Sequence, residues 1–308
     1  MRIGIDLGGT KIEGRAFDES GHAIDRIRVA TPREDYTGTI NAIADVVASL
    51  ETRAGAKGTV GVGIPGSIVR STGLVKNANS TWLNGRPVEA DLTKRLGREV
   101  RCANDANCLA LSEATDGAGA GYPFVFGVIV GTGCGGGIAI NAQVHAGPNG
   151  LAGEWGHNPL PWQNAAEWPG PPCYCGKRGC IEMWCSGTGL ELDFRTVTGK
   201  ALRGPEIVQL SETGDDEAEA ALERLEDRLA RSLATIVNSM DPDCFVLGGG
   251  LSQLDRLYAN LPKLLSLYTF GGAVEVPIKK AVHGDASGVR GAAWLWDGRD
   301  SAMTATHR

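Results

Sequence analysis

The stretch that decides the fold is RIGIDLGGTK, residues 2–11, in which a short apolar segment runs into a glycine turn. Residues 2–7 are typical of a β-strand, and residues 8–10 form the turn that ends it. The segments Ile12–Ala16 and Ala23–Val29 continue as short strands. The chain is therefore predicted to begin with three strands, the first of which leads directly into a glycine-rich turn.

Beyond these strands, the pattern changes to helices that alternate with strands. Apolar spacing predicts helices over 37–54, 88–96 and 106–115, with strands at 59–64 and 99–103. A Gly/Ala-rich break at 116–123 precedes a second set: strands 124–130 and 137–141, helix 217–240, strand 244–247, helix 255–268, strand 274–279 and helix 286–296. Each half of the chain opens with a strand, a glycine turn and a returning strand, and this is a weak internal repeat of topology rather than of sequence.

Length and composition limit the possible classes of protein. A chain of 308 residues is too long for one ordinary core and comfortable for two domains, which we place at 1–118 and 119–296, with a polar tail at 297–308. A net charge of −6 argues against nucleic acid as a partner. The longest apolar stretch, 124–130, is far shorter than the ~20 residues of a membrane helix. No signal segment follows Met1, so a cytoplasmic protein is expected.

Glycine turns end three of the predicted strands, at residues 6–11, 131–136 and 248–250. Glycines let the main chain approach a ligand closely, and the N–H groups at strand ends suit phosphate oxygens. Asp6 could hold Mg²⁺ through water. Any one of these turns alone could be a plain hairpin, but the three together favour a phosphate site.

Two better-known nucleotide motifs do not explain these turns. The P-loop pattern Gly-x4-Gly-Lys-Ser/Thr does not occur in the sequence. The spacing Gly131-x-Gly133-x-x-Gly136 matches a dinucleotide fingerprint, but that fingerprint must open a helix, and residues 138–141 are strand-like. The dinucleotide-binding fold is therefore excluded.

Asn104-Asp105 lies between the predicted strand 99–103 and the helix that follows it. An aspartate in this position is most often a helix N-cap. A carboxylate at the carboxyl end of a strand can instead face a cleft, where it accepts a proton from a hydroxyl that attacks a γ-phosphoryl group. The spacing leaves both interpretations of Asp105 open.

Three closely spaced cysteines and an upstream histidine predict a metal site rather than disulfides. The candidate ligands are Cys173, Cys175, Cys180 and His157, a set that Zn²⁺ binds tetrahedrally in structural sites. Gly176 and Gly179 allow the tight loop that such a site needs. His145 and Cys185 compete with His157 as the fourth ligand, and three free cysteines are the alternative to any metal.

Two carboxylates flank this cluster, Glu154 before His157 and Glu182 after Cys180. A bound zinc ion would fix both in space, and carboxylates accept hydrogen bonds from sugar hydroxyls. Solvated surface charges are the alternative interpretation.

The motifs described above, and their order along the chain, resemble those of the ROK sugar kinases over nearly the whole chain. The resemblance is carried by Asp6–Lys11, Asn104-Asp105, Gly131–Gly133, Glu154-x-Gly156-His157 and Cys173–Glu182. The first glycine turn is shared with the wider actin-like ATPase group, whereas the cysteine–glutamate segment is highly specific. Residues 77–85 (NANSTWLNG) and 288–296 (GVRGAAWLW) look like the bacterial fructokinase/mannokinase branch.

The resemblance implies an α/β, two-domain actin-like ATPase fold of the ribonuclease-H type, with an interdomain cleft and a zinc loop at 157–182. It implies that the final helix packs back on the first domain and that the chain forms a homodimer. It implies ATP and Mg²⁺ at the glycine turns, through Asp6, Gly8, Gly9, Thr10, Lys11, Gly131, Thr132, Gly133, Gly248, Gly249 and Gly250.

The sugar side follows from the same resemblance. It implies a hexose bound by Asn79, Asn104, Asp105, Glu154, His157 and Glu182. Asp105 is the implied general base, and structural Zn²⁺ is held by His157, Cys173, Cys175 and Cys180. One ring nitrogen of His157 would then bind zinc and the other would contact the sugar.

We expect ATP-dependent phosphorylation of a hexose 6-hydroxyl, with D-fructose as the first choice of substrate and mannose beside it. A glucokinase, an N-acetylhexosamine kinase and a non-catalytic sugar-binding protein are the alternatives. Repressors of the same family carry a winged helix-turn-helix before the first glycine turn. Here that turn begins within the first ten residues, so a kinase is expected.

Overall fold

The computed structural model describes residues 1–272 and 275–296, so the predicted polar tail 297–308 and the first residue of the predicted strand 274–279 lie outside it. The chain divides into two compact units. One comprises Met1–Pro123, Gly137–Ala152 and the residues from Val282 onward, and the other comprises Phe124–Gly136 and Gly153–Ala281. The units therefore interleave in sequence, whereas the predicted domains 1–118 and 119–296 are continuous.

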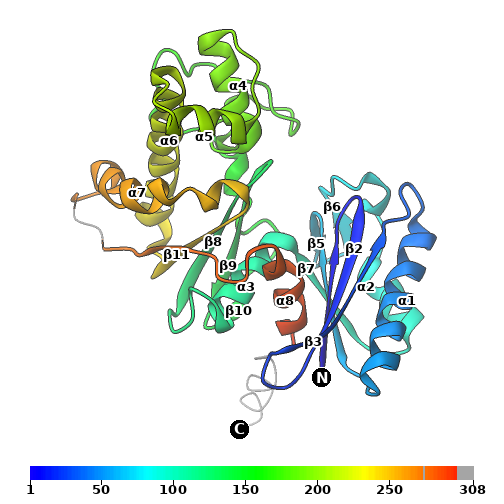
Figure 1. The fold of residues 1–308 in the computed structure, drawn as a ribbon. Coiled ribbons are helices and arrows are strands. Elements are labelled where there is room, and N and C mark those ends of the chain that lie inside the picture. The colour runs from blue at the N-terminus through cyan, green and yellow to red at the C-terminus, as the bar shows by residue number, and fades with distance from the viewer. Residues whose placement is uncertain (273–274, 297–308) are drawn as a thin grey trace. The chain divides into compact units, whose positions relative to one another are not determined.

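The first unit is built on a five-stranded sheet in the order β3-β2-β1-β4-β7 (Figure 1). Its strands are β1 (Arg2–Leu7), β2 (Lys11–Phe17), β3 (Ala23–Ala30), β4 (Thr59–Ile64) and β7 (Val100–Asn104). The strands β1, β2 and β3 pair antiparallel, whereas β1, β4 and β7 run parallel. Asp6 pairs with Gly63 and Ile64 with Asn104, so the carboxyl ends of the parallel strands meet at one edge.

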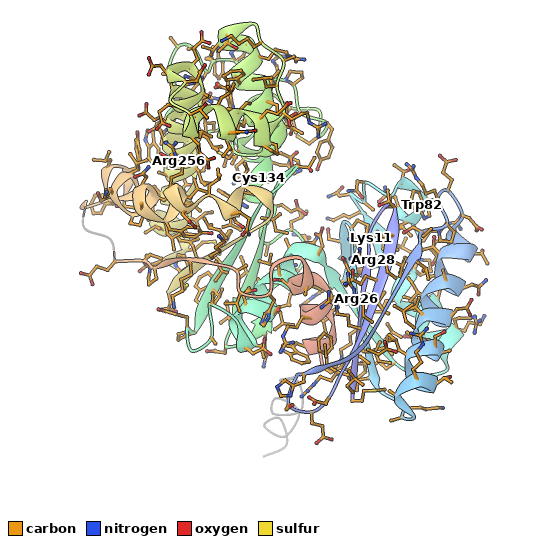
Figure 2. All side chains as sticks on the ribbon, viewed as in Figure 1. Lys11, Arg26, Arg28, Trp82, Cys134 and Arg256 are labelled. Atoms are coloured by element: carbon orange, nitrogen blue, oxygen red, sulfur yellow. The ribbon has the colours of Figure 1, made fainter. Side chains whose placement is uncertain are left out.

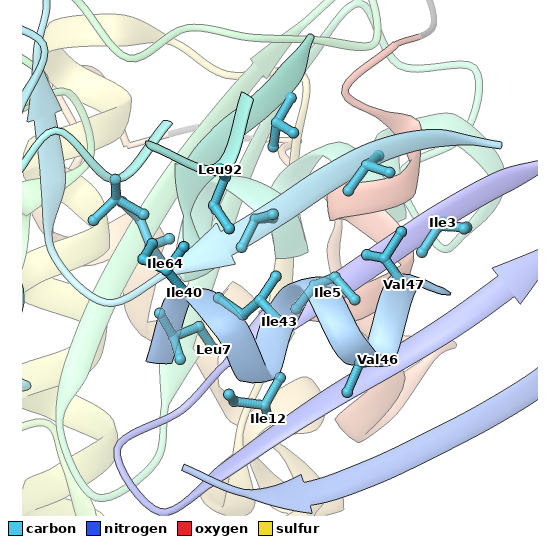
Figure 3. Close-up of a cluster of buried hydrophobic side chains, with 14 of the residues drawn as sticks. Ile3, Ile5, Leu7, Ile12, Ile40, Ile43, Val46, Val47, Ile64 and Leu92 are labelled. Carbon is cyan, nitrogen blue, oxygen red and sulfur yellow. The ribbon is translucent and has the colours of Figure 1, made fainter. Parts of the chain in front are cut away.

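One face of this sheet carries the apolar core. Ile3, Ile5 and Leu7 of β1 are buried on it, because alternate residues of a strand share a face. The helices α1 (Tyr36–Ala54) and α2 (Val88–Leu96) supply the opposing side chains, including Ile43 and Leu92 (Figure 3). Each such burial contributes about 1.5–3 kcal/mol.

The opposite face is packed almost backbone to backbone. A Cβ atom on Gly4 would lie 1.8 Å from the carbonyl oxygen of Val289, and one on Gly61 would lie 1.8 Å from that of Ala292. Both carbonyls belong to α8 (Ser287–Trp294), which also packs against α3 (Asp105–Asp116). Glycine is required at these positions because no other residue lets the helix lie so close to the strands.

Shorter elements complete the first unit. They are β5 (Ser67–Val69), β6 (Leu74–Lys76), η1 (Thr81–Leu83), β10 (Gln143–Val144) and η5 (Gly284–Ala286). The sequence pattern did not predict the β5–β6 hairpin, whose strands have three residues each. Strands this short carry too little periodicity to be found from sequence.

A second five-stranded sheet has the order β10-β9-β8-β11-β12. It adds β8 (Phe124–Val130), β9 (Cys134–Ile140), β11 (Cys244–Gly248) and β12 (Ile278–Lys280). As in the first sheet, the opening strand lies in the centre, its return strand lies on one side and later parallel strands lie on the other. The predicted repeat of topology is thereby confirmed.

The helices of the second unit are α4 (Gly187–Thr198), α5 (Gly204–Glu212), α6 (Asp216–Met240) and α7 (Asp255–Tyr268), with the short η2 (Glu154–His157), η3 (Ile181–Met183) and η4 (Gly250–Gln253). Two were not predicted, α4 and α5, although Ser186 caps α4 and Gly199 ends it in the left-handed region. The predicted strand 274–279 is shorter in the structure, and the predicted helix 286–296 is α8. None of the described helices is long and apolar enough to span a membrane.

Candidate functional site

In the first unit, the turn after β1 is held by its own backbone and by one threonine. Gly8 N donates to the Lys11 carbonyl at 2.9 Å. Thr31 closes the turn from outside, because its hydroxyl donates to the Gly8 carbonyl at 2.7 Å and its N–H to the Thr10 carbonyl at 3.1 Å. The sequence reasoning missed Thr31, since its partners lie more than twenty residues earlier in the chain.

Two carboxylates stand at the same edge of the first sheet, Asp6 at the end of β1 and Asp105 at the start of α3. Burial raises the pKa of Asp6 to about 6, and the negative charges of Asp105 and Glu13 contribute to the rise. Desolvation also raises the pKa of Asp105, although water reaches its side chain. Carboxylates with raised pKa values that act on each other favour a bound cation or a shared proton.

Asn104, not Asp105, is the N-cap of α3. Its Oδ1 accepts from Ala106 N at 2.9 Å, and its Nδ2 donates to the Gly66 carbonyl at 2.9 Å, which ties β7 to the turn after β4. Asp105 is the first residue of the helix, and the residue is exposed to solvent. The N-cap interpretation of Asp105 is therefore wrong, although its Oδ1 also accepts from Ala106 N at 2.8 Å.

Positive charge lines the strands beside this edge. Glu13 is buried on β2 and pairs with Arg15, Arg26 and Arg28; burial alone would raise its pKa, but these hydrogen bonds lower it to about 2. The positive charges of Lys11 and Arg28 also act on Asp6, where they partly offset the rise in its pKa. Figure 2 shows Lys11, Arg28 and Arg26 following one another along β2 and β3. The surplus of positive charge suits a phosphate-bearing ligand.

In the second unit, three glycine-rich segments converge on the end of β8. Gly131 accepts a hydrogen bond from Gly187 N at 2.7 Å, and Thr132 accepts one from the Thr188 hydroxyl at 2.8 Å, both at the start of α4. A Cβ on Gly249 would lie 2.7 Å from the Val130 carbonyl oxygen, so the turn after β11 also lies against this strand end. Gly187 and Thr188 were not predicted, although the sequence SGTG at 186–189 resembles the other glycine turns.

The two predicted sugar-binding glutamates belong to segments that meet at the start of β9. Glu182 Oε2 accepts from Cys134 N at 3.0 Å, and a Cβ on Gly133 would lie 2.6 Å from the same oxygen. The segment of Glu154 packs there as well, since a Cβ on Gly156 would lie 2.0 Å from the Cys134 carbonyl oxygen. Glycines at these positions thus allow the Glu182 carboxylate to lie beside Gly133 and the segment of Glu154 to pack against the start of β9.

The predicted metal ligands gather into one cluster. The donor atoms of His157, Cys173, Cys175 and Cys180 all lie within 4.8 Å of one another. The Cys175 and Cys180 sulfurs are 3.6 Å apart, and His157 Nδ1 is 3.6 Å from the Cys173 sulfur. Four ligands arranged tetrahedrally at about 2.3 Å from zinc are separated by roughly 3.8 Å, so the cluster fits the ion.

The loop geometry and the competing ligands support the same set. Gly176 and Gly179 both have positive φ, as the tight loop requires. The sulfur of Cys185 lies 3.9 Å from the Ser232 hydroxyl instead, and His145 belongs to the first unit. The eight cysteines form no disulfide.

An ion-pair network anchors the Pro/Trp-rich segment that precedes the cysteines. Glu167 is 2 % exposed and pairs with Arg228 and Arg231 of α6. Burial alone would raise the pKa of Glu167, but the hydrogen bonds from both arginines lower it to about 2. Arg231 also donates to the Trp162 carbonyl at 2.9 Å, which fixes the start of the same segment.

Tyr174 is a further residue of this region that the sequence reasoning missed. Its hydroxyl lies 2.9 Å from His157 Nε2. Desolvation by the surrounding protein raises the pKa of Tyr174 to about 12, although the residue as a whole is largely exposed, and the charges of Glu182 and Glu154 contribute to the rise. The tyrosine hydroxyl therefore lies in the field of both predicted sugar-binding carboxylates.

The predicted site residues divide between the two units. The first unit holds Asp6, Gly8, Gly9, Thr10, Lys11, Asn79, Asn104 and Asp105. The second unit holds Gly131, Thr132, Gly133, Glu154, His157, Glu182, Gly248, Gly249, Gly250 and the three cysteines of the cluster. Asn79 is exposed and precedes the buried Ser80, whose hydroxyl would lie 3.4 Å from a Cβ on Gly9.

Comparison with known proteins gives consistent matches along the chain. The model of the ROK family matches residues 2–299. The chain is 43 % identical to the N-acetyl-D-glucosamine kinase of Haemophilus influenzae, an alignment that covers 96 % of this chain and 99 % of that one.

Solved structures agree with the sequence matches. A ROK hexokinase from Thermus thermophilus superposes with a TM-score of 0.84 at 31 % identity, covering 96 % of this chain and 97 % of that one. A ROK family glucokinase from Streptomyces griseus, in complex with glucose and AMPPNP, superposes with a TM-score of 0.77 at 28 % identity, covering 96 % and 98 %.

Proposed function

The chain belongs to the ROK family of sugar kinases, and from that membership we propose that it transfers the γ-phosphoryl group of ATP to the 6-hydroxyl of N-acetyl-D-glucosamine. The observation that carries the choice of sugar is the 43 % identity to an N-acetyl-D-glucosamine kinase over 96 % of the chain. The fructokinase-like segments 77–85 and 288–296 favoured fructose, whereas the relatives favour the alternative of an N-acetylhexosamine kinase.

Asp105 is the proposed base of the reaction. Its carboxylate, whose pKa desolvation raises, accepts the proton of the sugar 6-hydroxyl while that oxygen attacks the γ-phosphorus of ATP. The bond from the γ-phosphorus to the bridging oxygen breaks, and the products are the sugar 6-phosphate and ADP. Asn104, Glu154, His157, Glu182 and Asn79 are the proposed contacts to the sugar hydroxyls.

The glycine turns at residues 8–11, 131–133 and 248–250 are the proposed contacts to the ATP phosphates, because their N–H groups can approach the oxygens closely. Asp6 is the proposed group that holds Mg²⁺ through water, and that ion would neutralise phosphate charge when bound. Lys11 and Arg28 add positive charge at the same edge. A homodimer stays a prediction from the family.

The zinc proposal rests on the chemistry of four donors that fit one tetrahedral ion. In this proposal His157, Cys173, Cys175 and Cys180 hold Zn²⁺ structurally. The ion would fix the loop that carries Glu182 and the ring of His157, and thus the sugar-binding groups.

A substrate panel tests the proposed function. The purified protein is assayed for ATP-dependent ADP release with N-acetylglucosamine, N-acetylmannosamine, glucose, mannose and fructose. We expect the highest kcat/KM for N-acetylglucosamine, by roughly 10-fold or more, since one group in a pocket changes selectivity by ~1–3 kcal/mol. A higher kcat/KM for fructose would instead support the fructokinase branch, and no turnover with any sugar would contradict the kinase.

The pH dependence of kcat/KM provides a second test. Asp105 must be ionised to accept a proton, and Asp6 must be ionised to hold the cation. Because the pKa of Asp6 is raised to about 6 and that of Asp105 is also raised, activity should fall as the pH drops through about 6. The measurement is kcat/KM from pH 5 to 8, and a profile that stays flat down to pH 5 would contradict it.

Circular dichroism over the same range is the control for unfolding. The ion pairs of Glu13 and Glu167, whose pKa values are about 2, contribute their full stabilisation above the ordinary value of 4.5. That stabilisation is lost only as the pH falls from 4.5 towards 2. The fold should therefore persist at pH 5, where activity is lost.

A further inference from the structure

Tyr174 stands between two candidate metal ligands, Cys173 and Cys175, so the loop that gathers the sulfurs also places its backbone. Cys173 N donates to the Lys177 carbonyl at 2.8 Å, and Gly176 N donates to the Cys173 carbonyl at 3.0 Å. Tyr174 as a whole residue is 80 % exposed. Burial in the core therefore does not force the tyrosine ring against His157, and the side chain can turn away from it.

The contact between Tyr174 and His157 is specific in geometry. The hydroxyl lies 2.9 Å from Nε2, and the two rings meet edge to face at 87°, with centroids 5.1 Å apart. The net free energy of a hydrogen bond between protein groups is modest, because water competes for the same hydroxyl. The contact is thus easily exchanged for another hydroxyl of similar strength.

The two nitrogens of His157 have different partners. Nδ1 faces the sulfur of Cys173 at 3.6 Å, while Nε2 faces Tyr174. A ring nitrogen carries either one hydrogen or one lone pair, so it makes one strong hydrogen bond at a time. A sugar hydroxyl can bind Nε2 only after the tyrosine hydroxyl has left.

The surroundings of the tyrosine hydroxyl are those that a sugar hydroxyl would find. The carboxylates of Glu154 and Glu182 both act on it electrostatically. Glu182 is held in place by Cys134 N, and Glu154 lies on the segment that packs at the start of β9. The hydroxyl therefore contacts one group proposed to bind sugar, His157, and lies in the field of two others.

We propose that Tyr174 is a gate on the sugar site: its hydroxyl takes the place of one sugar hydroxyl at His157 Nε2, and the sugar must displace it to bind. The gate rests on the proposed function, because it assumes that His157, Glu154 and Glu182 bind the sugar. It weakens sugar binding by the net value of one hydrogen bond, about 2- to 13-fold.

The test compares sugar binding by the wild-type protein and by Tyr174→Phe, which keeps the ring and removes the hydroxyl. N-acetylglucosamine is titrated calorimetrically without nucleotide, and KM is measured for sugar and for ATP. We expect the sugar Kd and sugar KM of the variant to fall about 2- to 13-fold, with the KM for ATP unchanged. Tyr36→Phe is the matched control, because its hydroxyl donates to Asp91 in the first unit at 2.6 Å.

Each other result of the experiment overturns the gate. An unchanged sugar Kd means that the hydroxyl does not compete with sugar, and a raised Kd means that it binds sugar or orients His157 instead. A second variant, Tyr174→Leu, should also tighten binding, and zinc content and melting temperature report whether the loop is intact. Failure of the wild-type protein to bind any sugar of the panel would overturn the proposed function and the gate together.

Discussion

Replacement of Asp105 by asparagine is expected to lower kcat by about 10²–10⁴-fold, the usual contribution of a general base. Asparagine has nearly the same shape as aspartate but cannot accept the proton of the sugar hydroxyl at neutral pH. The helix should survive the change, because its N-cap is Asn104 and because the amide oxygen of an asparagine can still accept from Ala106 N, as Asp105 does at 2.8 Å. The measurement is ADP release at saturating sugar and ATP.

The control for this variant is Asp45→Asn, which removes a carboxylate from the exposed side of α1 and should leave kcat unchanged. Calorimetric titration should show that Asp105→Asn still binds sugar, with a Kd within a few-fold of the wild type. Turnover close to normal in Asp105→Asn would mean that another group takes the proton, and the assignment of the base would be wrong.

Loss of the metal cluster is the second large effect. Cys175→Ser removes one of four thiolate or imidazole donors, and we expect zinc content to fall from about one per chain to well below that. Binding free energy of a structural metal is folding free energy, so the melting temperature should drop by at least about 10 °C, with sugar binding weakened as well. The measurements are elemental analysis and thermal unfolding followed by circular dichroism.

Cys102→Ser is the matched control, because Cys102 lies on β7 in the first unit and outside the cluster. Treatment of the wild-type protein with a strong chelator should reproduce the effect of Cys175→Ser. A metal-free wild-type protein that melts at its usual temperature would contradict a structural role for zinc.

The first sheet and its turns could be predicted because their signals are local. Residues 2–11 contain both a strand and the turn that ends it. Parallel pairing of β1, β4 and β7 then brings Asp6 and Asn104 to one edge of the sheet. The cysteine cluster was predictable for the same reason, since Gly176 and Gly179 mark a loop that is tight enough for metal ligands. Local patterns thus predicted the opening strands and the cysteine cluster, whereas the fold class and the sugar contacts followed from the resemblance to the ROK family.

What the sequence concealed depends on partners far apart in the chain. Glu167 holds the Pro/Trp-rich segment in place only through its ion pairs with Arg228, 61 residues later, and Arg231, 64 residues later. Spacing alone left His145 open beside His157 as the fourth ligand; the resemblance favoured His157, and the cluster in the structure contains it. Tyr174 gave no signal, because an exposed tyrosine between cysteines has no characteristic spacing.

The preference for fructose failed to gain support for a physical reason. The sugars concerned share most of their hydroxyls, so the carboxylates and amides that bind them are the same residue types in every branch. Discrimination comes from the pocket wall, where one added or missing group is worth ~1–3 kcal/mol. Short segments such as 77–85 do not encode that shape.

The close packing of α8 on Gly4 and Gly61 has a consequence for biosynthesis. Strands β1 and β4 emerge early from the ribosome, but the helix that covers their second face is translated more than two hundred residues later. Domains generally fold in the order of their synthesis. In this chain the second face of β1 and β4 therefore stays uncovered by α8 until translation is nearly finished.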